Sequence, residues 1–306
     1  MNKKDFRYIF FAIIFIIVCL FVFPDCAVCG EDKQIAIVVS KKIRPYMDVI
    51  EGITKGLKEK SRTIQIFFLL DSDARNNEKI FTKLEKGSFD FFSAIGPEAA
   101  EFLWNLDARH PKMFTAVLDP VGLLKTSLVK RGGSGCGISL RIPVDRQVYE
   151  ISKTFVHFKK IGLLFDARNN DWFYEEASQA SKKYGITIIP LKVESKKQIT
   201  QVLTSNWENI DCVWMIPDQT VISEKIIQYI IKRGIYNKKG VIGYNSFFIR
   251  SGAVFAFDFD YKALGFQAAK KIETYFKIGT CKQEPPEFQT VINQKMVDKI
   301  GLRVKE

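Results

Sequence analysis

Histidine is almost absent from this chain, since His110 and His157 are the only two in 306 residues. Most zinc sites and all Ser-His-Asp arrangements need a histidine close to partners of recognisable spacing, and neither histidine has such a motif beside it. Hydrolytic and metal-assisted chemistry is therefore disfavoured. We expect no catalytic residue and no metal ion.

Glycine-rich phosphate-binding motifs are missing from the places where a nucleotide fold needs them. The first expected strand ends at Ser40, and residues 41–45 read Lys-Lys-Ile-Arg-Pro instead of a glycine-rich turn. Residues 132–135, Gly-Gly-Ser-Gly, lack the Lys-Ser or Lys-Thr ending of a phosphate loop and indicate a turn before a strand. No cofactor is expected.

Cysteine is scarce in the body of the chain. Three of the six cysteines lie in the first 30 residues, which leaves Cys136, Cys212 and Cys281. Three thiols cannot all pair within one chain, so we expect no disulfide framework, although a bond between Cys136 and Cys281 stays open. Cys212 falls in an apolar strand, where a small buried thiol is the usual occupant.

A long block of basic residues is also missing, although the formal net charge is +12. Part of this charge lies at the start of the chain, and the rest is spread as Lys-Lys and Lys-Arg pairs near the ends of expected helices. Scattered charge is typical of a solvated surface, whereas nucleic-acid sites gather it in one patch. No nucleic-acid partner is expected.

The most apolar stretch of the chain lies near its start. Two lysines and an arginine precede an uninterrupted apolar run at residues 9–23, which Pro24 ends. This order is typical of a secretory signal peptide, which we assign to residues 1–30. The protein is therefore expected in the periplasm or at the cell surface.

Two other fates for this leader remain open. An uncleaved N-terminal anchor is one, because the apolar run approaches the length needed to span a bilayer. Lipid attachment at Cys26 or Cys29 is the other, although the residues before both cysteines fit a lipobox poorly.

From residue 34 onward the chain repeats a short apolar strand followed by an amphipathic helix. This alternation is typical of parallel α/β sheets whose strands are buried on both faces. The pattern restarts at Pro143, which indicates a second sheet. The expected strands are residues 35–40, 63–70, 89–96, 113–117 and 136–140 in the first sheet and residues 161–165, 187–193, 211–216 and 241–244 in the second.

We therefore predict an α/β fold of two Rossmann-like lobes with parallel sheets. A strand at residues 253–259, a helix at 261–278 and an extended piece at 288–292 follow, and they are expected to return to the first lobe and then to the second. The expected N-terminal lobe comprises residues 34–141 plus 255–280, and the expected C-terminal lobe comprises residues 142–254 plus 281–306.

Polar residues recur where the expected strands end. In open α/β sheets the carboxyl ends of the strands form the edge at which ligands bind. Asp, Asn and Ser at such junctions also cap helices and form turns, so each residue alone has that simpler interpretation. The candidate ligand-binding residues are Ser40, Gly96, Pro97, Glu98, Asp119, Asp166, Arg168, Asn169, Asp218, Gln219 and Asn245.

The chemistry of these residues suits a small solute that carries both charges. Backbone N–H groups at the helix start near Glu98 could hold a carboxylate, and Asp119 or Asp218 could hold an ammonium group. An amino acid satisfies both. Two cleft carboxylates could instead form an acid/base pair of an enzyme, but the sequence gives no distance between them.

Residues 114–122, Phe-Thr-Ala-Val-Leu-Asp-Pro-Val-Gly, resemble the ABC-type substrate-binding family whose members include tryptophan and tyrosine uptake proteins. The resemblance extends to residues 137–144, to Ile216-Pro217-Asp218, to residues 258–261 and to residues 291–302. It implies the type I periplasmic binding protein fold, in which two lobes are joined by three crossovers.

The same resemblance implies a function and a set of partners. The protein is expected to be the extracytoplasmic solute-binding subunit of an ABC importer that passes a small solute, such as an amino acid, to a membrane permease. A monomer is expected. The alternative is a ligand-sensing subunit that presents its closed form to a membrane receptor or kinase.

Three positions depart from the pattern that the resemblance implies. Gly96 stands where relatives commonly have a threonine, and Asp218-Gln219 stands where Asp-Asn is frequent. Residues 166–170, Asp-Ala-Arg-Asn-Asn, replace a more neutral Asn-Pro-Gly stretch. Arg168 in this stretch could meet a ligand carboxylate or lie in solvent.

Overall fold

The structure is a computed structural model of the whole chain, and it describes residues 32–58, 62–70, 74–106, 110–120, 122–123 and 135–305. The expected signal peptide or anchor at residues 1–30 lies outside the described residues. Within the part that is described, no helix is long and apolar enough to cross a membrane.

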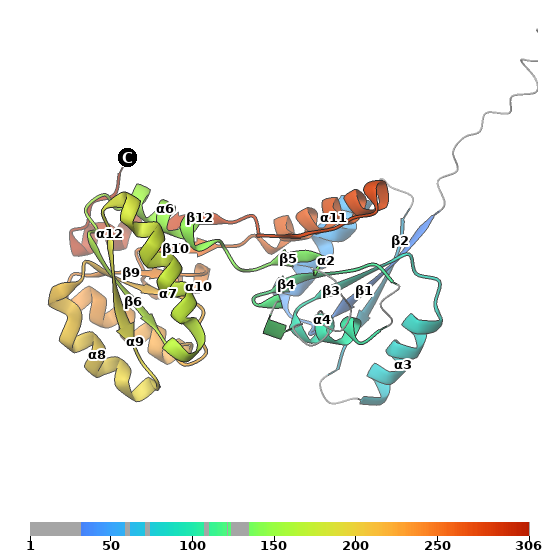
Figure 1. Cartoon of the computed structure of the whole chain (residues 1–306), viewed down its shortest axis with the longest axis horizontal. Coiled ribbons are helices and arrows are strands. Elements are labelled where there is room, and N and C mark those ends of the chain that lie inside the picture. Colours follow the sequence, from blue (N-terminus) through green and yellow to red (C-terminus); the bar gives the residue numbers. More distant parts are fainter. Residues whose placement is uncertain are drawn as a thin grey trace, which may run out of the picture.

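The described chain forms two lobes, each built around one sheet (Figure 1). The first sheet has the strand order β11-β5-β4-β3-β1-β2, and all of its pairings are parallel. Its strands are β1 (Lys33–Val39), β2 (Arg62–Phe68), β3 (Phe91–Ile95), β4 (Lys112–Val117), β5 (Gly137–Ser139) and β11 (Gln283–Glu284).

The second sheet has the order β12-β10-β9-β8-β6-β7, and its edge strand β12 runs antiparallel to β10. The expectation of a wholly parallel second sheet is therefore corrected at this edge, because the chain enters β12 directly from β11 of the first lobe and not from a helix that covers the second sheet. The strands are β6 (Lys160–Phe165), β7 (Thr187–Lys192), β8 (Cys212–Met215), β9 (Gly240–Gly243), β10 (Phe255–Asp258) and β12 (Gln289–Ile292).

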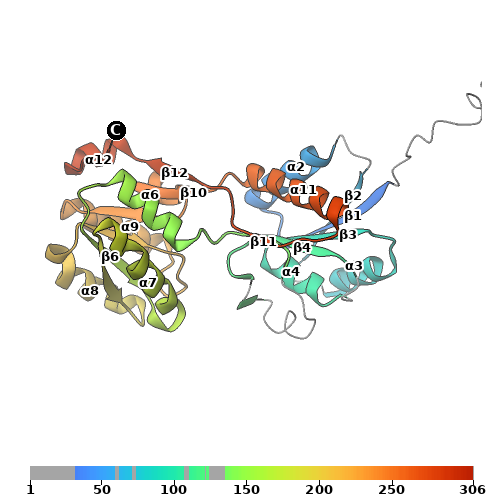
Figure 2. The ribbon, with the colours of Figure 1, turned by 45° about the horizontal axis from the view of Figure 1, so that its top comes forward.

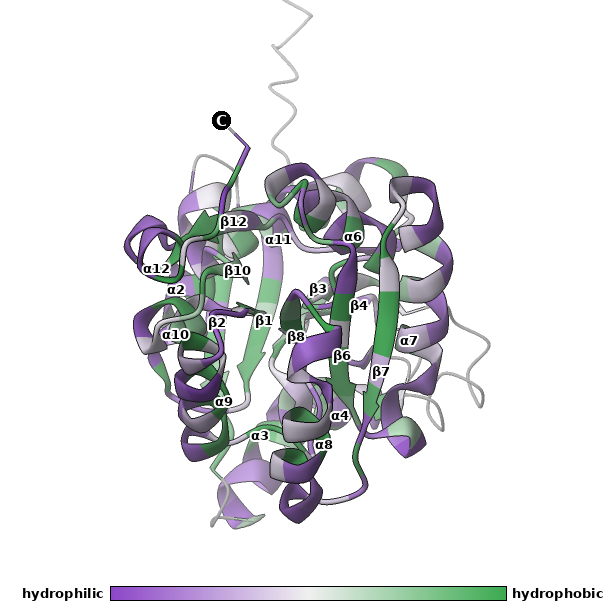
Figure 3. Cartoon of the chain, turned by 90° about the vertical axis from the view of Figure 1, so that its left-hand side faces the viewer, coloured by the Kyte–Doolittle hydropathy of each residue, from purple (hydrophilic) through white to green (hydrophobic). Residues whose placement is uncertain are grey.

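Helices cover both sheets and bury their apolar faces on them. Figure 3 shows the result for the second lobe, in which the strands are hydrophobic and the outer helix surfaces are hydrophilic. The helices are α2 (Arg44–Leu57), α3 (Ala74–Lys86), α4 (Pro97–Trp104) and α11 (Tyr261–Ile278) in the first lobe, and α6 (Val144–Thr154), α7 (Ala167–Ser181), α8 (Ile199–Asn206), α9 (Glu224–Tyr236), α10 (Ser246–Ser251) and α12 (Gln294–Ile300) in the second.

Helices α2 and α11 lie side by side on one face of the first sheet, although more than two hundred residues separate them (Figures 1 and 2). Gly52 and Gly265 allow the close approach, because a Cβ atom at Gly52 would lie 2.8 Å from the Cα of Gly265. Hydrogen bonds from Lys262 and Lys55 lower the pKa of Glu51 to about 2 and join the two helices at their surface.

The chain passes between the lobes three times, after β5, after β10 and after β11. This differs from the expected lobe boundaries in two stretches. Residues 255–258 lie in the second lobe, because β10 pairs with both β9 and β12. Residues 281–284 stay in the first lobe, because β11 pairs with β5.

A disulfide joins Cys136 and Cys281, whose Cα atoms are 5.2 Å apart, so the bond left open by the sequence forms in the structure. It anchors the chain before β11 to the chain before β5. Lys271 on α11, whose side chain is buried, adds an ion pair of 2.6 Å to Glu284. The chain that leads to the third crossover is therefore attached to the first lobe at two points. Cys212 is a free, buried cysteine.

Replacing Cys136 and Cys281 by serine together should lower the free energy of unfolding by about 4 kcal/mol, because the bond restricts an unfolded loop of 145 residues. Urea unfolding followed by circular dichroism measures the change. A reducing agent should lower the stability of the wild-type protein to that of the double variant and leave the double variant unchanged. Equal stability of the two proteins without reductant would contradict this assignment.

Candidate functional site

A cleft of about 550 Å³ lies between the lobes and is lined by residues of both. This volume falls within the range of about 300–1,000 Å³ that is typical of small-molecule sites. The first lobe and the first crossover contribute Leu118, Asp119 and Arg141. Residues of the second lobe that follow β6, β8 and β9 form the opposite wall.

The topology explains why the cleft lies here. Parallel strands end at one edge of a sheet, and the chain segments that leave that edge form the crevice in which open α/β folds bind ligands. Asp119 follows β4, Gln219 follows β8 and Asn245 follows β9. The three crossovers hold the carboxyl edge of the first sheet opposite the carboxyl edge of the second.

Aromatic side chains form much of the wall of the cleft. Trp172 and Phe173 come from the first turns of α7, Tyr244 from the end of β9, Phe259 from the second crossover, and Tyr261 from the start of α11. Burial raises the pKa of both tyrosine hydroxyls, and the negative charge of a nearby aspartate raises it further in each case. Both hydroxyls therefore remain protonated near neutral pH and can donate hydrogen bonds.

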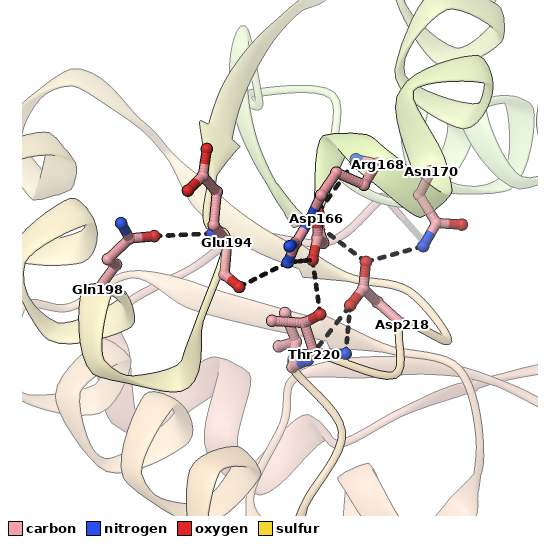
Figure 4. Close-up of polar contacts among 8 residues, drawn as sticks. Asp166, Arg168, Asn170, Glu194, Gln198, Asp218 and Thr220 are labelled. Carbon is pink, nitrogen blue, oxygen red and sulfur yellow. Dashed lines mark hydrogen bonds and ion pairs between the residues drawn. The ribbon is translucent and has the colours of Figure 1, made fainter.

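Two of the expected site residues, Asp166 and Asp218, are buried and are not among the residues that line the cleft. Figure 4 shows their polar contacts. Oδ1 of Asp218 accepts hydrogen bonds from the backbone N–H groups of Thr220 and Val221, at 2.8 and 3.2 Å. Its Oδ2 accepts from the backbone N–H of Asp166 at 2.8 Å and from Nδ2 of Asn170 at 2.7 Å. Asp218 therefore joins the ends of β6 and β8.

Both carboxylate oxygens of Asp166 also accept hydrogen bonds. Its Oδ1 accepts from the backbone N–H and Nε of Arg168, and its Oδ2 accepts from Nη2 of Arg168 at 2.5 Å and from the hydroxyl of Thr220 at 2.7 Å. The hydrogen bond from the Arg168 guanidinium is the main reason that the pKa of Asp166 lies well below its usual range. Asp166 is thus a permanently charged structural group.

Arg168 lines the cleft, but its guanidinium is folded back onto the protein. Besides its two bonds to Asp166, Nη2 donates to the backbone oxygen of Glu194 at 2.6 Å (Figure 4). The charge of Arg168 is therefore compensated by Asp166. Asn169 and Gln219 also line the cleft, as does Asn245, whose side chain caps α10 by accepting from the N–H of Phe247.

The expected residues near the start of α4 do not line this cleft. Ser40 is fully buried, and its Oγ accepts a hydrogen bond from the backbone N–H of Ala99 at 2.9 Å, so it caps α4. Pro97 opens the helix, and Glu98 forms an ion pair with Lys41 at 3.1 Å. None of the four expected residues from Ser40 to Glu98 is among those that line the cleft.

Gly96 has a structural explanation. Its φ of 90° lies in a region that residues with a Cβ rarely adopt, and a Cβ there would lie 2.8 Å from the hydroxyl of Tyr46. The phenol ring of Tyr46 therefore fills the space that a larger residue at position 96 would need. A threonine does not fit in this chain.

An ion pair that the sequence did not indicate lies in the cleft. Nη2 of Arg141 lies 3.1 Å from Oδ1 of Asp119, and both side chains are substantially exposed. The guanidinium carbon of Arg141 lies 4.4 Å from the ring centre of Trp172 in the second lobe. Arg141 and the five aromatic wall residues were not expected. Arg141, Trp172, Phe173 and Tyr261 come from a crossover and from helix turns, and Tyr244 and Phe259 lie at strand ends where only polar residues were considered.

No group of three or more His, Cys, Asp or Glu side chains capable of holding a metal ion occurs within the described ranges. Asp166 and Asp218 are close together, but every oxygen atom of both already accepts hydrogen bonds.

Residues 34–306 match the family model described as ABC transporter substrate binding protein, and the chain therefore belongs to this family. A tyrosine-binding protein of Clostridioides difficile (strain R20291) is 26% identical over 249 residues, which cover 78% of this chain and 71% of that protein. The resemblance stated from the sequence motifs is confirmed.

Two solved structures show the same fold. An ABC domain from Streptococcus pneumonia in complex with L-Trp is 21% identical, with a TM-score of 0.60 and coverage of 90% of this chain and 97% of that one. The ligand-free, open structure of a substrate binding protein with adhesive properties from Clostridium difficile is 20% identical, with a TM-score of 0.74 and coverage of 89% and 95%. The expected type I periplasmic binding protein fold is confirmed.

Asp218→Ala should lower the free energy of unfolding by about 3 kcal/mol, because four hydrogen-bond donors at the ends of β6 and β8 lose their acceptor. Urea unfolding measures this. Asp171→Ala is the matched control, since Asp171 is an exposed carboxylate on the adjacent helix paired with Lys192, and its loss should cost less than about 0.5 kcal/mol. Similar losses for both variants would refute the structural role of Asp218.

Proposed function

We propose that this protein is the extracytoplasmic solute-binding subunit of an ABC importer and that it captures an amino acid with an aromatic side chain. The observation that carries the proposal is the cleft itself. Its volume suits one small molecule and its wall is rich in aromatic rings. It also presents one exposed carboxylate and one exposed guanidinium side by side. The printed ligands of two relatives, tyrosine and L-Trp, support the same class.

The expected mechanism is closure of the lobes around the solute. The solute enters while the lobes are apart, contacts residues of both, and shifts the population towards a closed form because it binds that form better. The three crossovers are the segments that must bend. A permease in the membrane then receives the closed form, and the solute is released unchanged.

A catalytic role is not proposed, and the state of the carboxylates supports this choice. A general acid or base must reach its substrate and exchange a proton near the working pH. Asp166 and Asp218 are buried and do not line the cleft, and the pKa of Asp166 is lowered by Arg168. Binding without turnover therefore fits these residues better than hydrolysis does.

The site of action follows from the leader and the family. A signal peptide at residues 1–30 would export the chain, and retention of the leader as an anchor or a lipid at Cys26 or Cys29 would keep it at the membrane surface. The neighbouring permease is the expected partner. A receptor or kinase in its place would make the same cleft a sensor.

Titration calorimetry against the twenty amino acids tests the proposal, using the chain without residues 1–30. We expect one or more aromatic amino acids to bind and the others to bind at least tenfold more weakly. At 100 times the dissociation constant the bound ligand should stabilise the fold by about 2.7 kcal/mol, which a thermal shift reports. No binding of any amino acid, or equal binding of aliphatic ones, would contradict the proposal.

Phe259→Ala tests the aromatic wall. It should weaken binding of the aromatic amino acid about tenfold, since it removes one ring from the cleft. Phe266→Ala is the matched control, because Phe266 is a partly exposed ring on α11 that does not line the cleft.

Mass spectrometry of the ligand after incubation with the protein should show the ligand unchanged.

A further inference from the structure

We propose that Arg141 and Asp119 together form the subsite that recognises the α-carboxylate and the α-ammonium group of the ligand, with Trp172 holding Arg141 in position. This inference rests on the proposed function, because it assigns the two charged groups of an amino acid to two side chains of the cleft. It also identifies Arg141, which lies in the first crossover, as a residue that determines specificity.

The other charged groups near the cleft are already compensated. Asp166 and Asp218 are buried with all their oxygen atoms hydrogen-bonded, and the guanidinium of Arg168 is held by Asp166 and Glu194. Asp119 differs from the two buried aspartates, since its side chain remains 51% exposed. Exposure does not separate Arg141 from Arg168, whose side chains are 39% and 64% exposed. The difference is that Nε and Nη2 of Arg168 already donate to Asp166 and Glu194, whereas only Nη2 of Arg141 faces an acceptor among the described residues. Among the described residues that line the cleft, this pair therefore offers a ligand an accessible negative charge and an accessible positive charge.

The hydrogen bonds of the pair leave room for a ligand. Oδ1 of Asp119 accepts the backbone N–H of Gly122 at 3.2 Å and faces Nη2 of Arg141 at 3.1 Å. Oδ2 of Asp119 and the remaining N–H groups of Arg141 make no hydrogen bond to any residue that the structure describes. One oxygen thus orients the carboxylate, and the other can accept an ammonium group.

Trp172 lies against the Arg141 guanidinium, with 4.4 Å between the guanidinium carbon and the ring centre. A guanidinium stacked on an aromatic face keeps its N–H groups at its edge, where they can make the paired in-plane bonds that a carboxylate prefers. Trp172 lies on α7 of the second lobe, whereas Asp119 lies on the first. The subsite therefore draws on both lobes, and a ligand held there contacts both.

The order of charges explains why the pair suits an amino acid. A zwitterion placed beside the pair sets its ammonium group against Asp119 and its carboxylate against Arg141, so every neighbouring contact joins opposite charges. An amine without a carboxylate meets the positive charge of Arg141 without compensation. A carboxylic acid without an ammonium group meets the negative charge of Asp119 without compensation. The pair should therefore reject both analogues in favour of the amino acid.

Calorimetry with three matched probes tests this assignment. The probes are L-tryptophan, tryptamine, which lacks the carboxylate, and indolepropionate, which lacks the ammonium group; L-tyrosine, tyramine and hydroxyphenylpropionate form the parallel set. The wild-type protein should bind the amino acid about 10- to 100-fold more tightly than either analogue. Arg141→Gln should weaken the amino acid by a similar factor and leave the amine within about threefold. Asp119→Asn should weaken the amino acid and leave the acid within about threefold.

Arg146→Gln is the matched control, because the guanidinium of Arg146 also lies over an aromatic ring next to a crossover, that of Phe288, but outside the cleft. It should bind all three probes as the wild-type protein does. If Arg141→Gln weakened amino acid and amine equally, Arg141 would be a structural residue and the assignment would be wrong. If the wild-type protein bound neither amino acid, the proposed function would fail together with this inference. Binding without the analogue pattern would overturn the inference alone.

Discussion

The three passes of the chain between the lobes determine where a ligand can bind. They place the carboxyl ends of two sheets opposite each other, so that polar residues after β4, β8 and β9 share one cleft. The crossovers are also the segments through which one lobe can move relative to the other. The disulfide from Cys136 to Cys281 and the ion pair from Lys271 to Glu284 attach the third crossover firmly to the first lobe. Within the third crossover, bending is thereby confined to the few residues between β11 and β12.

Much of this fold could be predicted from the sequence, because strands buried on both faces appear as continuous apolar runs that alternate with amphipathic helices. Strands β1, β4, β6 and β9 occur where that pattern indicated them. A short strand without apolar residues could not be assigned in this way. Gln283–Glu284 of β11 is polar and exposed, and its membership of the first sheet depends on a distant disulfide and on pairing with β5.

The site could be predicted only in part. The sequence indicated the edge of the sheets at which the cleft lies, and Asp119, Arg168, Asn169, Gln219 and Asn245 line that cleft. It could not distinguish a carboxylate that is exposed in the cleft from one that organises the backbone. That difference depends on the number of N–H groups that the fold brings to each oxygen, as at Asp218. Arg141 and Trp172 could not be identified from the sequence, because only the folded chain brings these two distant residues into contact.

The most direct test of this account is the distance between the lobes with and without ligand. Spin labels at Glu101→Cys on α4 and Lys225→Cys on α9 place one exposed probe on each lobe, away from α11 and the crossovers (Figure 1). In the chain without residues 1–30, Cys136 and Cys281 are bonded and Cys212 is buried, so the new thiols can be labelled selectively. Pulsed electron resonance should show a shift to shorter distances on addition of the aromatic amino acid, with the same midpoint as calorimetric binding. An unchanged distance distribution with the amino acid bound would contradict the account.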